Sequence, residues 1–398
     1  MTNSKLWHAD DGDNLHELIE HYTVGNDQVL DQALLGYDIT ATKAHAHMLN
    51  DISILTDEEY KKLASGLDDL LAEWQNGSFK ITSDHEDGHT AIELYLTEKI
   101  GDVGKKVHTG RSRNDQALVM MRLYLKDNLQ KTIESLKDVV DAYDTKIKDA
   151  GKQDMPGYTH TQKAMPTTVA TWLGAYRDAF EDLMPFLQTT IAAIDQNPLG
   201  SAAGFGVSLP LNRDMTTREL GFAKTQENPI YCGMSRGTFE LMAVQALTPL
   251  MTFAGKFAQD MIQFTTQDTH FFSLPKSMTT GSSIMPHKRN YDVFEIMRAN
   301  SHEFSSRTIA LYSVIGGVGS GYHRDLQLTK DTTLRAFTVA LETLDVLSLC
   351  VRHIVIHHKT LDAAMTGELH TVTEINKLVA QGVPFRDAYQ QVKRSLNL

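Results

Sequence analysis

Residues 118–151 read LVMMRLYLKDNLQKTIESLKDVVDAYDTKIKDAG, and this stretch decides the fold. Its apolar side chains recur at the spacing that places them along one face of a helix. They are Leu118, Met121, Leu125, Leu129, Leu136, Val140, Tyr143 and Ile147. Gly151 marks the end, because glycine readily adopts the left-handed backbone that terminates helices. The spacing therefore predicts a helix about three times as long as the ~11-residue average.

Four more segments show helical spacing over comparable lengths, and no strand pattern of similar strength accompanies them. They run from about 167 to 191 with a kink expected at Pro185, from about 235 to 264 with an interruption at Pro249, from 292 to about 314, and from about 331 to 357. The chain is therefore predicted to be all-α, with a central bundle of five long helices. Such helices need neighbours along their whole length, so we expect several chains to assemble into one bundle.

The lengths of the predicted helices divide the chain into three regions. Residues 1–110 alternate short helices with turns, including a helix opened by Thr56 as N-cap and a helix from Asp87 to Ile100. Residues 111–360 hold the long helices, and residues 361–398 hold two short helices around Gly382-Val383-Pro384. We expect an N-terminal helical domain, a central long-helix domain and a C-terminal helical domain with these boundaries.

Composition excludes several classes of protein. Asp and Glu number 50 against 38 Lys and Arg, which argues against general nucleic-acid binding. Cys232 and Cys350 lie far apart and form no CxxC pair, which excludes a disulfide scaffold and a thiolate zinc site. No run of ~18 apolar residues occurs, and the N-terminus is polar. We expect a soluble cytoplasmic protein that binds neither membranes nor nucleic acid.

Four polar segments each lead toward a predicted long helix. They are KKVHTGRSRNDQ at 105–116, GYTHTQK at 157–163, GSSIMPHKRN at 281–290 and GSGYHRDLQLTK at 319–330. Arginine pairs bind carboxylates bidentately, and a helix N-terminus adds positive potential. The glycine, serines and proline of the third segment suit a loop that closes over a substrate. Each segment alone is compatible with a solvated loop or a helix cap, but four together predict a site for an anionic small molecule.

These segments resemble the sequence motifs of the fumarase/aspartase superfamily, and the resemblance covers almost the whole chain. HTGRSRNDQ at 108–116 is similar to the version of the first motif found in argininosuccinate lyases. YTHTQ at 158–162, the GSSxMPxKxN loop, PLGSAAG at 198–204 and YxRDLQxxK at 322–330 match further motifs. The resemblance implies a homotetramer with a twenty-helix core and active sites shared by three subunits. It also implies reversible elimination of argininosuccinate to arginine and fumarate, without cofactor or metal.

The resemblance implies catalytic roles for four residues. Ser282 holds the position of the family's base, and loop closure, nearby amides and Lys288 must stabilise its alkoxide. His160 is the candidate for the other proton transfer, to the departing guanidinium nitrogen. Glu295 resembles the carboxylate that orients this histidine. The carbanion next to a carboxylate must be held as a doubly charged aci-carboxylate, which requires cations and amides aimed at its oxygens.

The remaining expected site residues bind substrate. Those around the succinyl half are Arg113, Asn114, Thr159, Lys288 and Asn290, and those around the arginine half are Tyr322, Gln327 and Lys330. Further substrate-binding candidates are His89, Arg111, Gln162 and Arg324.

The chain departs from the family pattern at several places. Tyr291 replaces a proline after the loop, and Gly88 replaces an aliphatic residue. A serine that contacts substrate in the family is replaced within residues 24–27. The sequence also ends soon after Pro384-Phe385-Arg386, so we expect a shortened C-terminal domain.

Two rival functions remain open at the level of sequence. One is another lyase of the superfamily, such as adenylosuccinate lyase. The other is a catalytically silent, crystallin-like structural protein on the same fold. A kinase loop at His323-Arg324-Asp325-Leu326 is rejected because Lys330 stands where a metal-binding asparagine belongs. His353, His357 and His358 lack a nearby carboxylate partner, so no metal site is expected there.

Overall fold

A computed structural model describes residues 16–82 and 85–396, and most of these residues are helical. The predicted all-α class is confirmed. The chain forms two compact units. Unit 1 takes in the described residues of Met1–Gln130, Leu187–Ala246 and Ser306–Phe337, and unit 2 those of Lys131–Phe186, Leu247–Ser305 and Thr338–Leu398. The three-domain division at residues 110 and 360 stays a prediction.

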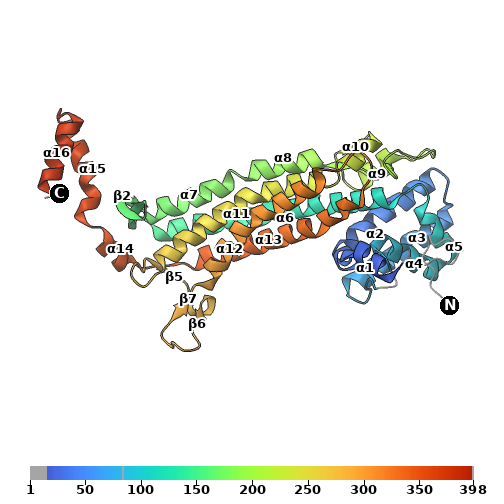
Figure 1. The fold of residues 1–398 in the computed structure, drawn as a ribbon, viewed down its shortest axis with the longest axis horizontal. Coiled ribbons are helices and arrows are strands. Elements are labelled where there is room, and N and C mark those ends of the chain that lie inside the picture. Colours follow the sequence, from blue (N-terminus) through green and yellow to red (C-terminus); the bar gives the residue numbers. More distant parts are fainter. Residues whose placement is uncertain (1–15, 83–84, 397–398) are drawn as a thin grey trace. The chain divides into compact units, whose positions relative to one another are not determined.

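The N-terminal part of unit 1 is a cluster of helices of unequal length, and the longest, α2, equals α13 in length (Figure 1). They are α1 (Glu17–Val24), α2 (Asp27–Asp51), α3 (Asp57–Gln75), α4 (Gly88–Ile100), α5 (Asp102–Lys105) and a 3₁₀ turn (Lys106–His108). Thr56 caps α3 as predicted, and Glu59 completes a reciprocal capping box with it. Leucine and isoleucine side chains from α2, α3 and α4 pack into one buried core, among them Leu35, Leu67 and Leu96.

Four long helices have residues in both units. They are α6 (Arg113–Ala150), α11 (Thr238–Phe264), α12 (Asp292–Ile315) and α13 (Thr329–His353). Their bounds confirm the sequence prediction, except that Pro249 lies inside α11 without ending it and α13 stops at His353, before the predicted 357.

The predicted helix at 167–191 is wrong as a single element. It is two helices, α7 (Val169–Glu181) and α8 (Met184–Ile194). Pro185 lies in the first turn of α8, where a missing N–H costs no hydrogen bond, so the proline starts a new helix rather than kinking one.

Aromatic side chains hold the long helices together within each unit. In unit 2, the buried Tyr143 of α6 meets Phe257 of α11 edge-on at 5.6 Å and Phe180 of α7 at 6.0 Å. Asp260 of α11 accepts hydrogen bonds from the Trp172 indole and the Tyr176 hydroxyl of α7, at 2.8 and 2.7 Å. In unit 1, Tyr124 of α6 packs edge-on against Phe337 of α13 at 5.6 Å. Tyr143, which belongs to the apolar stripe predicted from the sequence, is thus covered by rings of two other helices.

Short strands and helices connect the long helices, and the sequence predicted none of the strands. Four two-stranded sheets pair β1 (Asp154–Thr159) with β2 (Gln162–Thr168), β3 (Gln196–Asn197) with β4 (Lys224–Thr225), β5 (Phe272–Ser273) with β8 (Val355–Ile356), and β6 (Thr280–Gly281) with β7 (Arg289–Asn290). Only β3–β4 is parallel. The remaining α-helices are α9 (Arg213–Glu219), α10 (Pro229–Met234), α14 (His358–Ala364), α15 (Thr371–Ala380) and α16 (Phe385–Ser395). Among the described residues, no helix combines the length and apolarity needed to cross a membrane.

A buried ion pair joins α2 to α4. His89 Nδ1 lies 2.5 Å from Asp38 Oδ2, and both side chains are almost inaccessible to water. Burial alone would lower the pKa of His89, but the Asp38 carboxylate raises it above its ordinary value. The charged pair therefore stabilises the fold below the unfolded-state pKa of about 6.5, and this stabilisation is lost as pH rises through the folded-state pKa.

We expect His89→Asn to lower the free energy of unfolding by about 3–5 kcal/mol near pH 6, because one charge of a buried pair is left alone. The difference in free energy of unfolding between wild type and His89→Asn should shrink as the pH rises. Urea unfolding followed by circular dichroism from pH 6 to 9 measures it. His47→Asn is the control, because His47 pairs with Glu219 at the surface and should cost less than about 1 kcal/mol. Parallel pH profiles for wild type and His89→Asn would contradict the assignment.

Helices α11 and α12 approach each other closely where Gly255 faces Ser301. A Cβ on Gly255 would lie 2.2 Å from Ser301 Oγ and 2.5 Å from its Cβ, so rotation of the serine cannot remove the clash. Gly255→Ala should destabilise the protein by about 1–3 kcal/mol. Gly174→Ala in α7, where a Cβ meets no atom within 4 Å, should instead stabilise it by up to about 1 kcal/mol. Thermal unfolding of both variants tests the contrast, and shifts of the same sign would refute it.

Candidate functional site

Unit 1 contains an open cavity of about 710 Å³, including the solvent at its mouth. Its walls come from α2, the start of α4, the start of α6, the segment before α11 and the segment 322–330. Seven of the predicted substrate-binding residues line it: His89, Arg113, Asn114, Tyr322, Arg324, Gln327 and Lys330. Val24, Asp27, Asp31, Glu86, Asp87, Ala117 and Arg236 complete the lining. Residues of two of the four predicted segments, 105–116 and 319–330, therefore line one polar cavity. The meeting of all four segments in one site stays a prediction.

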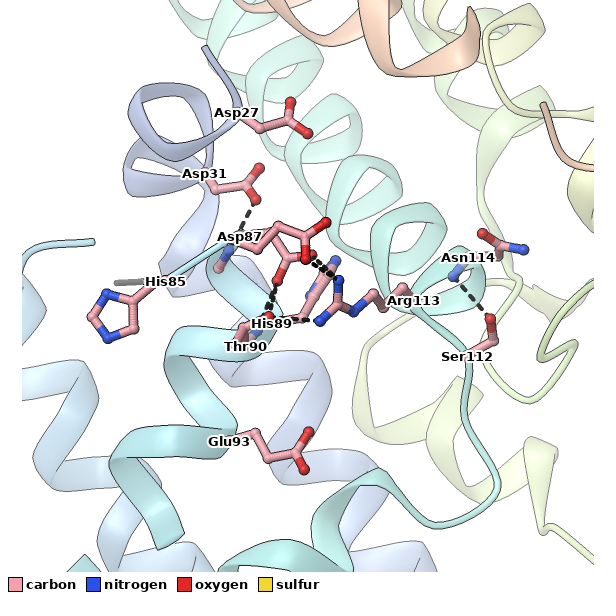
Figure 2. Close-up of polar contacts among 12 residues, drawn as sticks. Asp27, Asp31, His85, Asp87, His89, Thr90, Glu93, Ser112, Arg113 and Asn114 are labelled. Atoms are coloured by element: carbon pink, nitrogen blue, oxygen red, sulfur yellow. Dashed lines mark hydrogen bonds and ion pairs between the residues drawn. The ribbon is translucent and has the colours of Figure 1, made fainter. Parts of the chain in front are cut away.

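Arg113 is fixed at one wall by the start of α4 (Figure 2). Its Nη1 lies 3.2 Å from both Glu86 Oε2 and Asp87 Oδ2, and its Nη2 donates to Thr90 Oγ1 at 2.7 Å. Asp87 also caps α4 by accepting from the Thr90 amide. Burial would raise the pKa of Asp87, but the charges of His89 and Arg113 bring it below its usual value. The guanidinium is thus held in place by an ionised carboxylate at a helix start.

Asn114 follows at the N-terminal end of α6, where the helix dipole places positive potential. Its backbone N–H donates to Ser112 Oγ at 3.3 Å, and its side chain lines the cavity. Figure 2 shows Asn114 and Arg113 on the first turn of the same helix. This end of the cavity is suited to a carboxylate.

Another part of the wall is built around Lys330, in the first turn of α13. Its Nζ lies 2.6 Å from Asp31 Oδ1 and 2.9 Å from Asp27 Oδ1, and the side chain is 6 % exposed. Burial alone would lower the pKa of Lys330, but the two carboxylates raise it above its ordinary value. Gln327 Nε2 donates to the carbonyls of Thr23 and Val24 at 3.0 and 3.1 Å. Two of the three predicted arginine-half residues, Gln327 and Lys330, are thus anchored to the end of α1 and the start of α2.

Arg111 lies elsewhere. It is buried and does not line the cavity; its guanidinium donates to Thr42 Oγ1 at 3.0 Å and to the Val107 carbonyl at 3.1 Å. These hydrogen bonds support the turn before α6. Contact of Arg111 with substrate stays a prediction.

Five charged cavity residues were missed by sequence reasoning: Asp27, Asp31, Glu86, Asp87 and Arg236. Asp27 and Asp31 are four residues apart on α2, which puts both carboxylates on one helix face. This spacing could have indicated them from the sequence. Arg236 lies between two motifs, in a stretch that gave no signal of its own.

Unit 2 carries His160 on the turn of a hairpin. Thr159 and Gln162 pair across β1 and β2, and His160 and Thr161 form the two-residue turn between them. Their φ angles are 52° and 62°, so both residues adopt the left-handed backbone of a type I′ turn without being glycine or asparagine. Such backbone strain concentrates at functional sites. The turn presents His160 and Thr161 to solvent, with Gln162 exposed beside them.

The segment 281–290, also in unit 2, is a second hairpin. β6 and β7 pair at Gly281 and Arg289, and the intervening residues form an exposed loop. Ser282 Oγ accepts a hydrogen bond from the Met285 amide at 3.0 Å and a longer one from the Ile284 amide at 3.4 Å. Lys288 is exposed on this loop, and Asn290 Nδ2 donates to Thr280 Oγ1 at 3.4 Å across its base.

Glu295 lies exposed in the first turn of α12. Within the part of unit 2 that the structure describes, no hydrogen bond or ion pair joins His160 to Glu295 or to the 281–290 hairpin. The orientation of His160 by Glu295 therefore stays a prediction.

Comparisons with known proteins agree over most of the chain. Residues 17–303 match the family model described as Lyase. The chain is 41 % identical over 388 residues to an argininosuccinate lyase of Thermotoga neapolitana, with 98 % of this chain and 97 % of the relative covered. It is 40 % identical to an argininosuccinate lyase of Phocaeicola vulgatus, with 98 % and 86 % covered.

Solved structures share the fold. A variant of EDDS lyase with bound fumarate has a TM-score of 0.79 at 25 % identity, covering 96 % of this chain and 76 % of that one. The class II fumarase of Schistosoma mansoni has a TM-score of 0.78 at 16 % identity, covering 95 % and 91 %. These likenesses confirm the fumarase-type fold. Because similarity at 41 % identity extends over 98 % of its length, the chain belongs to the argininosuccinate lyase family of lyases.

Proposed function

We propose that the protein catalyses the reversible elimination of argininosuccinate to arginine and fumarate. The observation that carries this is the cavity in unit 1, where Arg113 and Asn114 at the start of α6 share one space with Gln327 and Lys330. Argininosuccinate bears carboxylates at one end and an amino-acid group at the other. A cavity with both cationic and anionic walls is complementary to such a molecule.

The chemical step is removal of a proton next to a carboxylate. Ser282 is the proposed base, and it is a weak acid whose alkoxide needs stabilisation. The amide of Met285 already donates to its Oγ at 3.0 Å, which favours the charged form of the oxygen. Lys288, on the same loop, would add positive charge when the loop closes over substrate. His160 would exchange the proton at the guanidinium nitrogen, oriented by Glu295.

The dicarboxylate intermediate would be held by Arg113, Asn114, Thr159, Lys288 and Asn290 through hydrogen bonds that strengthen as charge develops. The arginine half would lie against Tyr322, Arg324, Gln327 and Lys330, with His89 and Gln162 nearby. All of these steps use side chains and backbone amides of the protein.

We also propose a homotetramer in which three chains contribute to each site. Large apolar side chains on α12 are exposed in the single chain, among them Ile296, Ile309 and Tyr312. An exposed apolar surface on a long helix favours burial against another copy. Both cysteines are buried and free, which is consistent with the proposed cytoplasmic location.

Ser282→Ala should lower kcat with argininosuccinate by at least about a thousandfold, because the base is removed. The absorbance of fumarate at constant enzyme concentration measures the rate, and sedimentation checks that the assembly is intact. Ser283→Ala is the matched control and should retain most activity. Full activity of Ser282→Ala would show that Ser282 is not the base. Turnover of adenylosuccinate instead would favour the other lyase, and no turnover by the wild type would favour the structural protein.

Mixing two inactive variants tests whether sites are shared. Ser282→Ala and Asn114→Ala should each be inactive, and after joint refolding in equal amounts the mixture should recover roughly a quarter of wild-type activity by random assortment of chains. The recovery arises because some sites then draw an intact Ser282 and an intact Asn114 from different chains. A mixture as inactive as its components would show that each site draws both residues from one chain.

A further inference from the structure

The chain that leads into α6 is supported by a buried histidine that lies outside the cavity. His45, on α2, is fully buried, and its Nε2 lies 2.9 Å from the carbonyl oxygen of Thr109. Thr109 precedes the start of α6, where Arg113 and Asn114 line the cavity. His45 does not line the cavity, so its effect on a ligand must pass through this segment.

The carbonyl that His45 meets belongs to the central peptide of a type II turn. The turn begins at His108, with Thr109 at φ −56° and ψ 126° and Gly110 at φ 73°. The Arg111 amide closes it by donating to the His108 carbonyl at 3.1 Å. In a type I turn the central peptide is rotated by about 180°, so the Thr109 carbonyl would face the other side of the turn. The hydrogen bond from His45 therefore favours the type II form.

The surroundings of His45 fix which of its nitrogens carries the proton. A carbonyl only accepts, so Nε2 is the N–H that donates to Thr109. Nδ1 is buried and has no hydrogen-bond partner among the described residues. The titratable groups that act on the ring are Arg111 and His108. Burial, and then the charge of Arg111, lower the pKa of His45 well below its ordinary value. His45 is therefore a neutral donor with a single partner.

A second contact from α2 holds the same segment. Thr42, three residues before His45, accepts from the Arg111 guanidinium through its Oγ1 at 3.0 Å. Residues three apart lie on one helix face, so α2 holds the segment at two points. The Thr42 contact fixes a side chain, whereas the His45 contact fixes a peptide plane of the backbone. Only three residues separate Thr109 from Arg113, so rotation of that peptide would redirect the chain just before α6.

We propose that His45 is a positioning residue: by donating to the Thr109 carbonyl it holds the type II turn that leads into the carboxylate-binding end of the cavity. It acts through Arg113 and Asn114 and touches no substrate itself. The inference rests on the proposed function, which assigns these two residues to the succinyl half. Loss of the donor should therefore weaken the binding of a dicarboxylate and leave the binding of arginine unchanged.

Two substitutions separate the hydrogen-bond donor from the bulk of the ring. Glutamine can place an amide N–H where Nε2 lies, whereas methionine fills similar space without a donor. Titration calorimetry of the full-length protein with fumarate and with arginine gives a dissociation constant and a stoichiometry for each. His45→Met should weaken fumarate by about 3- to 10-fold, the factor that one lost hydrogen bond gives, and change arginine by less than about 2-fold. His45→Gln should recover most of the loss.

The matched control is His47→Met, two positions further along α2, where the histidine pairs with Glu219 near the surface. It should leave both dissociation constants unchanged. If His45 only stabilises the fold, His45→Met should lower the stoichiometry at unchanged dissociation constants, or weaken both ligands alike. Either result would overturn the proposal.

A backbone variant tests the same turn without touching His45. Gly110→Ala places a Cβ at φ 73°, a region that L-residues rarely adopt, and so favours the type I form. It should weaken fumarate and spare arginine, and it decides the matter even if His45→Met does not fold. The double variant should lose less than the product of the two single losses, because the same turn is lost only once. Unchanged fumarate affinity in Gly110→Ala, or losses that multiply, would refute the role of the turn.

Failure of the positioning role is distinguishable from failure of the proposed function. Turnover of argininosuccinate by the wild type, with unchanged fumarate affinity in His45→Met, would sustain the function and reject the positioning role. Selective loss of fumarate affinity in that variant, without turnover by the wild type, would sustain the positioning role and reject the reaction.

Discussion

A lysine with 6 % of its side chain exposed keeps its charge only when carboxylates surround it, and the cavity of unit 1 is organised by this requirement at Lys330. Asp31 and Asp27 meet the requirement from consecutive turns of α2. The ion pairs fix the start of α13 against the start of α2. They thereby hold the 322–330 segment, including Gln327, in the cavity that Arg113 also lines.

The same rule explains why the polar cavity lies at the ends of long helices. The buried faces of their middles are covered by apolar and aromatic side chains, as at Tyr143. Helix ends carry unpaired amides and loops of small polar residues, where charges can be paired or solvated. Arg113, Asn114 and Lys330 each lie in the first turn of a long helix.

The sequence predicted the features that depend on local periodicity and missed those that depend on partners. The existence and approximate extent of α6 and α12 follow from apolar spacing, with Gly151 marking the end of α6. The β1–β2 hairpin has no comparable signal, because its turn uses His160 and Thr161 where such turns favour asparagine and glycine. Arg111 stands in the same motif as Arg113 but is buried behind the cavity, and which of two nearby arginines faces a ligand depends on packing. Asp27 forms its ion pair with Lys330, which is 303 residues away in sequence. No local pattern could therefore indicate this contact.

The 281–290 hairpin sets a condition on catalysis. Ser282 accepts amide hydrogen bonds that favour its alkoxide, yet the loop that carries it is exposed, with Ile284 83 % accessible. In water, one or two such bonds cannot offset the weak acidity of a serine hydroxyl, because solvent screens them. The same bonds gain strength once water is excluded. The exposed Ile284 and Met285 at the tip would supply the apolar cover for such exclusion. The proposed base would therefore be inactive while the loop is open, and binding of substrate and ionisation of Ser282 would be a single coupled event.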